Sequence, residues 1–437
     1  MKKEIKYSIC IFTIIFIVTA CGKSGSNQPP APVVNTGLVN TSHLDYLYTP
    51  VTFTTGTKAA GVYIYAEAPD YHTVEAAGEG FTCIDDVARA VLVYTRSDKF
   101  STDTAVQAKA FNLIRFILEM QSDNGYFYNF LYTNGLINKF GSTSVNNANW
   151  WSWRALLALT EVAPLVKNMD ALLYGQMDAA VNKLVVQIKN ELVNLPQTTK
   201  IVSGITVPEW LPANSATDQS ALLILGLIPY CTVTGDAAIK DYIKKLADGI
   251  ALMQVGDATH YPYSCFLSWE NTWHAYGNIQ AYAMLKAGVF LNDVQYTNKA
   301  LAEIDNFYPW LLQNGYQSSF SLAKDGETFQ KLTGKEYEQI AYGITPMVFA
   351  AVEAYTITGQ DKYADIAGHL AAWFLGANAE STNMFNVSTG RCFDAISGAG
   401  SINKNSGAES TIEALFTMQL IEDHPAVKTA FDKYKKP

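Results

Sequence analysis

Apolar residues recur at spacings of three and four along most of the chain, beginning near residue 84. This period is typical of amphipathic α-helices, and loops rich in Gly, Asn, Asp and Pro separate about twelve such segments. Short polar turns such as Thr234-Gly235-Asp236 join the segments in pairs and favour antiparallel neighbours. The six predicted helical hairpins are 84–98 with 102–121, 149–165 with 169–194, 217–234 with 236–255, 271–291 with 294–315, 337–358 with 360–376, and 408–421 with 424–435.

Short turns within the pairs alternate with long connections between them. A closed ring of hairpins requires this alternation, because all the long loops then emerge on one rim and can build a cleft. An open helical solenoid is the alternative. The first helix of each pair, for example over 88–94, is almost entirely apolar, as expected for an inner ring that is buried on every side. We therefore predict an all-α fold, an (α/α)6 toroid.

The segment before the first hairpin has a different character. Residues 44–74 lack helical periodicity and contain β-branched, Tyr-rich stretches such as Val62-Tyr63-Ile64-Tyr65, which predict a short hairpin or extended lead-in. No linker rich in Pro, Ser or Gly interrupts the chain after residue 40. We therefore expect residues 41–437 to form one toroid domain.

The first twenty residues have the pattern of an export signal. Two lysines precede an apolar run from Ile9 to Val18, which is too short to span a bilayer comfortably. The residues before Cys21, Val-Thr-Ala, resemble the bacterial lipobox. We predict a signal peptide over 1–20, a lipidated Cys21 and a flexible tether over 21–40, and hence a lipid-anchored protein of the bacterial cell envelope. The alternative is an ordinary secreted protein in which Cys21 carries no lipid.

Composition narrows the range of partners. The formal charge of −9 becomes −11 once three Lys and one Glu leave with the signal peptide, and no basic block remains, which argues against nucleic acid as a partner. The cysteines after Cys21 are widely scattered, so neither a disulfide framework nor a zinc knuckle is indicated. His72 and His274 are too few and too isolated for a metal centre. We expect a monomer without metal or other cofactor.

Polar residues gather where the inner helices are predicted to begin. Because these helices run parallel in a ring of hairpins, their N-terminal ends meet at one rim, and five of the six starts carry a carboxylate. Acidic residues are also favoured there as caps, but capping does not explain the Trp and Tyr beside them. Carboxylates next to aromatic platforms predict a sugar-binding cleft. The residues at these starts are Asp85 and Asp86; Asn146, Asn147, Trp150, Trp153 and Arg154; Asp218 and Gln219; Glu270, Trp273 and His274; Glu336, Glu338 and Gln339; and Glu409.

Hydrolysis of a glycosidic bond needs a protonated carboxylic acid for the leaving oxygen and a carboxylate for water or the anomeric carbon. A helix N-terminus stabilises a charged carboxylate, which suits Asp85 and Asp86 to the role of base. Glu409 and Glu270 are the candidate acids, and Glu270 lies between tryptophans. The predicted substrate-binding residues are Trp150, Trp153, Arg154, Trp273, His274, Tyr276 and Gln339.

Two arginines are expected to be buried and therefore to need carboxylate partners. Arg89 and Arg154 lie one turn into predicted inner helices, and a buried guanidinium is stable only when a carboxylate balances it. Asp86 or Glu409 would serve. A salt bridge at the rim is therefore the structural interpretation of both arginines, beside a role for Arg154 in substrate binding.

Three motifs resemble one known family. Residues 83–90, Cys-Ile-Asp-Asp-Val-Ala-Arg-Ala, look like the "DD-x-ARA" signature of a six-hairpin, glycosidase-like domain often fused to bacterial glycosyltransferases. Residues 403–411, Asn-Lys-Asn-Ser-Gly-Ala-Glu-Ser-Thr, resemble its "N-x-N-x-GAEST" ending, and residues 373–378 match its "WFLG-x-N" stretch. The resemblance spans about residues 75–420 and implies the same toroid fold.

The layout is also similar to family-nine cellulases. In these enzymes an early pair of aspartates activates water, and a late glutamate near the start of the last inner helix is the acid. Carried over by position, the resemblance implies that Asp85 or Asp86 is the base and that Glu409 is the acid.

Three functions fit these features. The first is a glycoside hydrolase, inverting, that acts on an oligo- or polysaccharide at the cell envelope. The second is a polysaccharide lyase or epimerase on the same fold, for which His274 and Arg154 are available, although an acidic rim would repel a polyanionic substrate. The third is a glycan-binding lipoprotein without catalysis.

Overall fold

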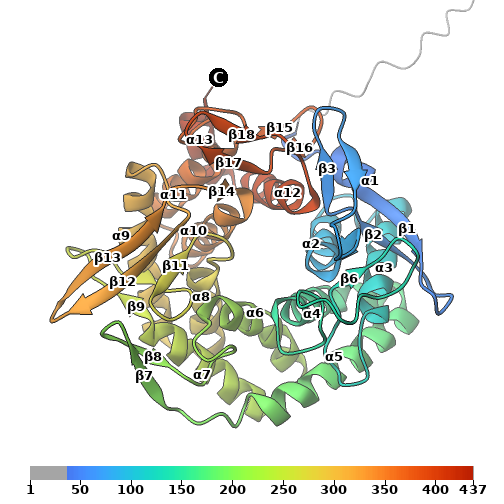
Figure 1. Cartoon of the computed structure of the whole chain (residues 1–437), viewed down its shortest axis with the longest axis horizontal. Helices are drawn as coiled ribbons and strands as arrows, with labels where there is room; N and C mark the ends of the chain where they lie inside the picture. The colour runs from blue at the N-terminus through green and yellow to red at the C-terminus, as the bar shows by residue number, and fades with distance from the viewer. Residues whose placement is uncertain (1–36, 437) are drawn as a thin grey trace, which may run out of the picture. The chain divides into compact units, whose positions relative to one another are not determined.

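The computed structural model describes residues 37–436, in which twelve helices form a ring of six antiparallel hairpins (Figure 1). All six hairpins predicted from the sequence are present, and a short helix, α1 (Ser42–Leu47), precedes them. The predicted signal peptide, Cys21 and most of the tether lie outside the described residues. The hairpins are α2 (Ile84–Thr95) with α3 (Thr104–Glu119), α4 (Trp150–Met169) with α5 (Ala171–Glu191), α6 (Thr217–Thr234) with α7 (Ala237–Leu252), α8 (Gln280–Leu291) with α9 (Val294–Gln313), α10 (Thr345–Thr358) with α11 (Asp361–Ala371), and α12 (Ala408–Asp423) with α13 (Pro425–Tyr434).

The inner helices close the ring. Each of α2, α4, α6, α8, α10 and α12 packs against the next, and α12 packs against α2. This closure confirms the toroid and excludes an open solenoid. The inner helices are buried on nearly every side, as in α6, where every residue from Thr217 to Leu227 is buried. The pattern explains why the first helix of each pair is so apolar.

Short turns connect the two helices of each hairpin, and side chains fix where the outer helices begin. An aspartate accepts hydrogen bonds from free backbone amides at four of these starts, which satisfies donors that the helix leaves unpaired. At their C-terminal ends, α6 and α10 are followed by Gly235 and Gly359, both with a left-handed φ of 66° that glycine adopts without strain. The four capping residues are Asp103, Asp170, Asp236 and Asp293.

Small antiparallel sheets occupy the long connections. The predicted lead-in is confirmed as the hairpin of β1 (Tyr48–Thr52) and β2 (Lys58–Val62), followed by β3 (Tyr65–Glu67) and β4 (His72–Val74). The remaining strands and two 3-10 turns are β5 (Thr82–Cys83), β6 (Phe130–Leu131), β7 (Thr199–Val202), β8 (Ile205–Pro208), β9 (Gln254–Val255), β10 (Cys265–Phe266), β11 (Thr272–His274), β12 (Ser319–Asp325), β13 (Thr328–Lys335), β14 (Gln339–Ile340), η1 (Ala341–Gly343), η2 (Ala372–Phe374), β15 (Phe385–Asn386), β16 (Arg391–Cys392), β17 (Ala395–Gly398) and β18 (Ser401–Asn403).

Two inner helices begin about two turns later than the periodicity predicts. The helix α8 begins at Gln280 and α10 begins at Thr345. Strand pairing explains both differences, because β11 pairs with β12 and β14 pairs with β17, which keeps these segments extended. The candidate site residues that therefore lie on strands and loops instead of helix starts are Glu270, Trp273, His274, Tyr276 and Gln339.

The four cysteines within residues 37–436 are free and buried. Over the same residues, none of the helices combines the length and the apolar character needed to cross a bilayer. From Gly37 onward the chain forms one compact unit.

Buried Glu303 on α9 gives the fold a testable pH dependence. Burial raises the pKa of Glu303 to about 8, although the Phe266 amide donates to its Oε1 at 2.7 Å. The folded protein therefore retains a proton that the unfolded chain releases near pH 4.5, so stability falls as the pH rises from about 4.5 to 8. Glu303→Gln removes this proton, and we expect it to be more stable than the wild type at pH 8 by up to about 4 kcal/mol.

Urea unfolding of both proteins at pH 5 and pH 8 tests this expectation. Glu327→Gln, at an exposed position in the β12–β13 turn, is the matched control and should leave the pH dependence unchanged. Equal free energies of unfolding for Glu303→Gln and wild type at pH 8 would show that ionisation of Glu303 does not destabilise the folded protein.

Candidate active site

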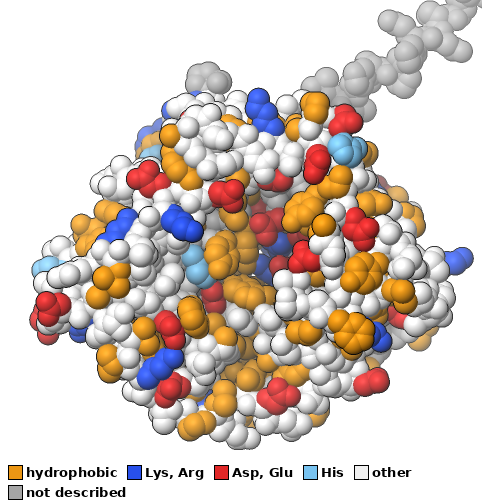
Figure 2. All heavy atoms as spheres, in the orientation of Figure 1, with side chains coloured by type: hydrophobic (Ala, Val, Ile, Leu, Met, Phe, Trp, Pro, Cys, Tyr) orange, Lys and Arg blue, Asp and Glu red, His pale blue; other side chains and the backbone are white. Residues whose placement is uncertain are grey.

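Two adjoining cavities of about 400 and 360 Å³ form one cleft at the rim where inner helices begin. Asp85, in the first turn of α2, and Glu409, in the first turn of α12, line both cavities, together with Asn129, Phe130 and Ile340. Figure 2 shows a hollow near the middle of the molecule, where acidic and basic side chains lie among hydrophobic ones. The ring thus brings the two motifs from opposite ends of the sequence to one cleft.

The floor of this cleft is built around Arg89 of α2, whose side chain is 2% exposed. Its Nη1 donates to Glu413 Oε1 at 2.8 Å, and its Nη2 donates to Asp86 Oδ1 at 2.8 Å and to Glu409 Oε2 at 3.2 Å. Asp85 Oδ2 lies 4.0 Å from the same Nη2. One guanidinium therefore holds carboxylates from two neighbouring inner helices, and the salt bridges predicted for Arg89 are present.

Arg154 of α4 lies beneath the floor and does not itself line the cleft cavities, where the sequence predicted it to bind substrate. Its Nε donates to Asp85 Oδ1 at 2.9 Å, and its Nη2 donates to the hydroxyl of Tyr342. The ring of Tyr342 lies 5.0 Å from the guanidinium carbon of Arg154 and 5.0 Å from that of Arg89. Such cation–π contacts stabilise a desolvated guanidinium. Arg154 therefore orients Asp85 from below the cleft.

The four carboxylates around Arg89 differ in how far they are exposed to solvent. The side chains of Asp85 and Glu409 are 32% and 42% exposed, whereas those of Asp86 and Glu413 are 5% and 4% exposed. The exposed pair can reach a bound molecule, and the buried pair holds Arg89. Asp85 Oδ2 and Glu409 Oε2 both lie near Arg89 Nη2, at 4.0 and 3.2 Å, so they are at most about 7.2 Å apart.

The buried acids hold protons more tightly than ordinary carboxyl groups. Burial raises the pKa of Asp86 to about 7; the charge of Arg89 opposes this rise, whereas Glu409 and Asp85 add to it. Burial likewise raises the pKa of Glu413. Perturbed acids in a cleft are typical of catalytic sites, although structural ion pairs produce them too. The cluster can therefore exchange a proton near neutral pH.

Asp394 belongs to the cleft and was not among the residues predicted from the sequence. Its Oδ1 accepts hydrogen bonds from the Gly407 amide at 2.8 Å and from the Ser410 hydroxyl at 2.6 Å. These bonds fix the start of α12, where Glu409 lies. Burial raises the pKa of Asp394, and the charge of Glu409 adds to the effect. The residue precedes β17 in an irregular segment, where no periodicity marks it.

Aromatic side chains form one wall of the cleft. Trp150, Trp151 and Tyr276 line the cavity that Asp85 and Glu409 also line. These residues come from the start of α4 and from the loop before α8. Broad rings beside carboxylates can stack on the faces of a sugar. The predicted roles of Trp150 and Tyr276 are thus compatible with their positions.

His274 supports this wall from behind. Its ring stacks on Tyr276 with centroids 3.8 Å apart and an interplanar angle of 7°. Its Nε2 lies 3.0 Å from Asp218 Oδ2, and its Nδ1 lies 2.8 Å from the Tyr276 carbonyl oxygen. His274 therefore orients Tyr276 and does not itself line the cleft cavities.

Four other candidates lie outside the cleft, which corrects the prediction from helix starts. Glu270 lies in the loop before β11 and forms an ion pair with Lys200 at 2.7 Å. Trp153 is fully buried and donates to Gln219, and Trp273 stacks on Phe320 in the core. Gln339 is buried as well and donates to the carbonyl oxygens of Gly315 and Glu336. Apolar packing and backbone pairing, rather than a ligand, explain the positions of these side chains.

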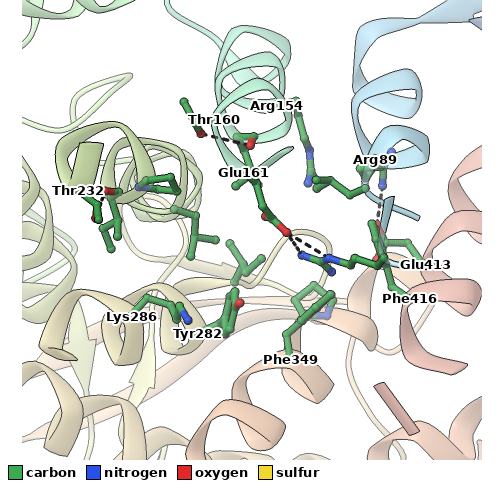
Figure 3. A pocket seen from close by; sticks show the side chains of 18 of the residues that line it. Arg89, Arg154, Thr160, Glu161, Thr232, Tyr282, Lys286, Phe349, Glu413 and Phe416 are labelled. Carbon is green, nitrogen blue, oxygen red and sulfur yellow. Dashed lines mark hydrogen bonds and ion pairs between the residues drawn. The ribbon is translucent and has the colours of Figure 1, made fainter. Parts of the chain in front are cut away.

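A larger cavity of about 490 Å³ lies on the other side of the floor, within the ring (Figure 3). Arg89, Arg154 and Tyr342 line it, and most of its other walls are Leu, Ile, Pro and Phe. Its two carboxylates are occupied, because Glu413 is bound to Arg89 and Glu161 is bound to Arg96 at 2.7 Å. The exposed acids therefore face the cleft, not this apolar cavity.

Within residues 37–436, no group of three or more His, Cys, Asp and Glu side chains has the arrangement of a metal site. In the cleft, Arg89 and Arg154 hold Asp85, Asp86 and Glu409, so a cation at these three carboxylates would have to displace an arginine.

Comparisons with known proteins place the fold. No family model matches the sequence, and no curated protein is similar to it. Among solved structures, the chain is similar to a sugar epimerase from a ruminal bacterium, with a TM-score of 0.59 and 11% identity over 83% of this chain and 92% of that one.

Two further solved structures are similar to the chain in fold. A cellobiose 2-epimerase from Bacillus thermoamylovorans has a TM-score of 0.53 and 13% identity over 83% of this chain and 92% of its own. A family 76 glycoside hydrolase from a bovine Bacteroides thetaiotaomicron strain has a TM-score of 0.56 and 12% identity over 90% of this chain and 79% of its own. The chain therefore has the six-hairpin (α/α)6 fold, which it shares with these enzymes.

Proposed function

We propose that this protein is a glycoside hydrolase in which Asp85 acts as the base and Glu409 as the acid. The observation that carries the proposal is that these two carboxylates line the same cleft, face solvent, and lie at most about 7.2 Å apart around Arg89. Hydrolysis needs such a pair on either side of the scissile bond. The fold supports the proposal, because glycoside hydrolases and sugar epimerases share it.

The surroundings of Asp85 suit a base. Its Oδ1 accepts a hydrogen bond from Arg154 Nε at 2.9 Å, and this contact fixes the orientation of the carboxylate. Its Oδ2 accepts no hydrogen bond from another described residue and can orient a water molecule toward the anomeric carbon. This arrangement favours inversion, in which a water molecule fits between base and sugar.

The surroundings of Glu409 suit an acid. Asp86, Asp394 and Glu413 are near enough for their charges to interact with that of Glu409. Like charges favour a shared proton on one member of such a cluster. Glu409 is the most exposed of these acids in the cleft, where its carboxyl group can contact the leaving oxygen.

The experiment is to incubate purified protein with a panel of neutral oligosaccharides of defined anomeric configuration and to follow the first product by proton NMR. We expect cleavage with inversion at the anomeric carbon. Cleavage with retention would overturn the assignment of Asp85 as a general base, and an inactive protein across a broad panel would count against hydrolysis itself.

A sugar epimerase is the second candidate. The His274–Asp218 pair behind the cleft wall is the observation that favours it, because a histidine oriented by a carboxylate is a common general base; here both ring nitrogens face acceptors, so one contact would have to break first. An epimerase would incorporate solvent deuterium at the inverted carbon without releasing a smaller sugar. A hydrolase would release a smaller sugar without that exchange. We favour the hydrolase because the acids, not His274, line the cleft.

Tyr276 is proposed to bind a sugar ring. It lines the cleft, is 48% exposed, and is held by the stacked ring of His274. Replacement by alanine removes the platform, so we expect KM to rise roughly tenfold with little change in kcat. Tyr276→Phe keeps the ring and should behave like the wild type. A fall in kcat with unchanged KM in Tyr276→Ala would show that Tyr276 acts in the chemical step instead.

We further propose that the enzyme works at the bacterial cell envelope on a glycan presented there, anchored through lipid on Cys21. The proposal rests on the sequence pattern of residues 1–26 alone. Metabolic labelling with a radioactive fatty acid tests it, because label should enter the wild type and not Cys21→Ser. Equal labelling of both proteins, or of neither, would contradict the anchor.

A further inference from the structure

A separate pocket of about 430 Å³ lies beside the strands β15 and β16. None of its lining residues lines the catalytic cleft or the apolar cavity within the ring. Arg391 of β16, Tyr71 of the β3–β4 turn and Asn383 are among its walls, with Phe393 and Leu375 as apolar neighbours. The pocket therefore combines one cation, amide and hydroxyl groups, and apolar surface.

Arg391 differs from the other four arginines of the chain, each of which forms an ion pair with an acid. Within residues 37–436, no carboxylate lies within 4.0 Å of its guanidinium, and neither Nη atom has a hydrogen-bond acceptor. Its Nε is buried and has no hydrogen-bond partner in the part of the chain that the structure describes. A desolvated donor without an acceptor costs free energy, which an incoming anion would recover.

The position of this guanidinium is fixed by its neighbours. The ring of Tyr71 lies 4.1 Å from its central carbon. Tyr71 has a left-handed φ of 59°, a strained conformation for a residue with a side chain, and such strain is common at binding sites. One face of the Arg391 guanidinium is therefore covered by the Tyr71 ring, which leaves its N–H groups available to a ligand.

Nearby groups do not supply the missing counter-ion. His43 is near enough for the charge of Arg391 to act on it. Burial lowers the pKa of His43, and the positive charge of Arg391 lowers it further. A histidine carries no negative charge in either form, so it cannot balance Arg391. The segment 22–36, which precedes the described residues, contains neither Asp nor Glu. No acidic side chain of the described residues pairs with Arg391, and the segment 22–36 has none to offer, so an anion from another molecule can take this place.

We propose that this pocket binds the carboxylate of a sugar acid, with Arg391 as its anchor. A planar guanidinium matches a carboxylate with two parallel hydrogen bonds. The volume of about 430 Å³ and the apolar walls exceed what a small inorganic anion needs, and suit a carboxylate on a sugar-sized skeleton. The acidic cleft repels such a group, so the two sites bind different units.

Isothermal titration of the full-length protein with glucuronate, with glucose as its neutral analogue, tests this site without relying on catalysis. We expect glucuronate to bind, glucose to bind at least about tenfold more weakly, and Arg391→Gln to weaken glucuronate by at least about tenfold. Arg391→Lys keeps the charge but cannot form two parallel hydrogen bonds to a carboxylate. Its affinity for glucuronate should lie between those of the wild type and Arg391→Gln. Added salt should weaken binding.

Arg115→Gln, at a half-exposed arginine on α3, is the matched control and should bind glucuronate like the wild type. Circular dichroism of each variant verifies that it is folded. Equal binding of glucose and glucuronate, unchanged binding in Arg391→Gln, or no binding to wild type would overturn the proposal. Inorganic sulfate or acetate binding as tightly as glucuronate would show a simple anion site and overturn the sugar-acid assignment.

Discussion

Replacing Asp85 with asparagine should lower kcat by a factor on the order of 10³, and Glu409→Gln should do the same, because each change removes one half of the acid–base pair. The shape of each side chain is preserved, so KM should change little. In Asp85→Asn the amide can no longer accept a proton from water, although it can still accept a hydrogen bond from Arg154. Steady-state kinetics on any substrate that the wild type cleaves provides the measurement.

Glu270→Gln is the matched control for both variants. The sequence alone ranks Glu270 beside Glu409 as a candidate acid, but the structure pairs it with Lys200, outside the cleft. We therefore expect its kcat to stay within about twofold of the wild type, since surface pairs contribute little. If Glu270→Gln lost activity and Glu409→Gln kept it, the proposed acid would be wrong.

Removal of Arg89 should have the largest effect on stability. Arg89→Met leaves the buried carboxylates of Asp86 and Glu413 without their cation, and breaking a buried pair from one side costs about 3 to 5 kcal/mol. The free energy of unfolding, measured in urea, should fall by this amount at pH 8. The loss should be smaller at pH 5, because both acids can then be protonated in the fold.

Two further variants separate charge from packing. In the triple variant Arg89→Met, Asp86→Asn, Glu413→Gln, the uncompensated charges are gone, and most of the stability should return. Arg115→Met, which removes an exposed arginine 3.6 Å from Asp170, should cost less than about 1 kcal/mol. A stability of Arg89→Met equal to that of Arg115→Met would mean that the floor of the cleft does not depend on this cation.

Much of the fold follows from periodicity, and the exceptions have physical causes. Helical spacing and short polar turns identify all six hairpins, because local propensity and tertiary packing agree there. The predicted starts of α8 and α10 are about two turns too early, since apolar residues in the segments 271–279 and 337–344 also recur at spacings of three and four. Pairing of β11 with β12 and of β14 with β17 decides their conformation, and such pairing with distant strands leaves no local signal.

Three of the predicted carboxylates lie within the first turn of a helix that begins as expected. Asp85, Asp86 and Glu409 meet that condition, and they lie around one guanidinium. Glu413 could have been found, because it lies one turn after Glu409 on the same face of α12. Asp394 could not, because it reaches the cleft from an irregular loop through contacts with Gly407 and Ser410.

The most direct test of the central claim is mass spectrometry of the products formed in water enriched in ¹⁸O. Hydrolysis through Asp85 and Glu409 predicts that the wild type releases smaller sugars whose combined mass exceeds that of the substrate by one labelled water, with ¹⁸O at the anomeric carbon. Asp85→Asn should release none over the same period. Products of unchanged total mass, whether an epimer or an unsaturated pair, would contradict hydrolysis at this cleft.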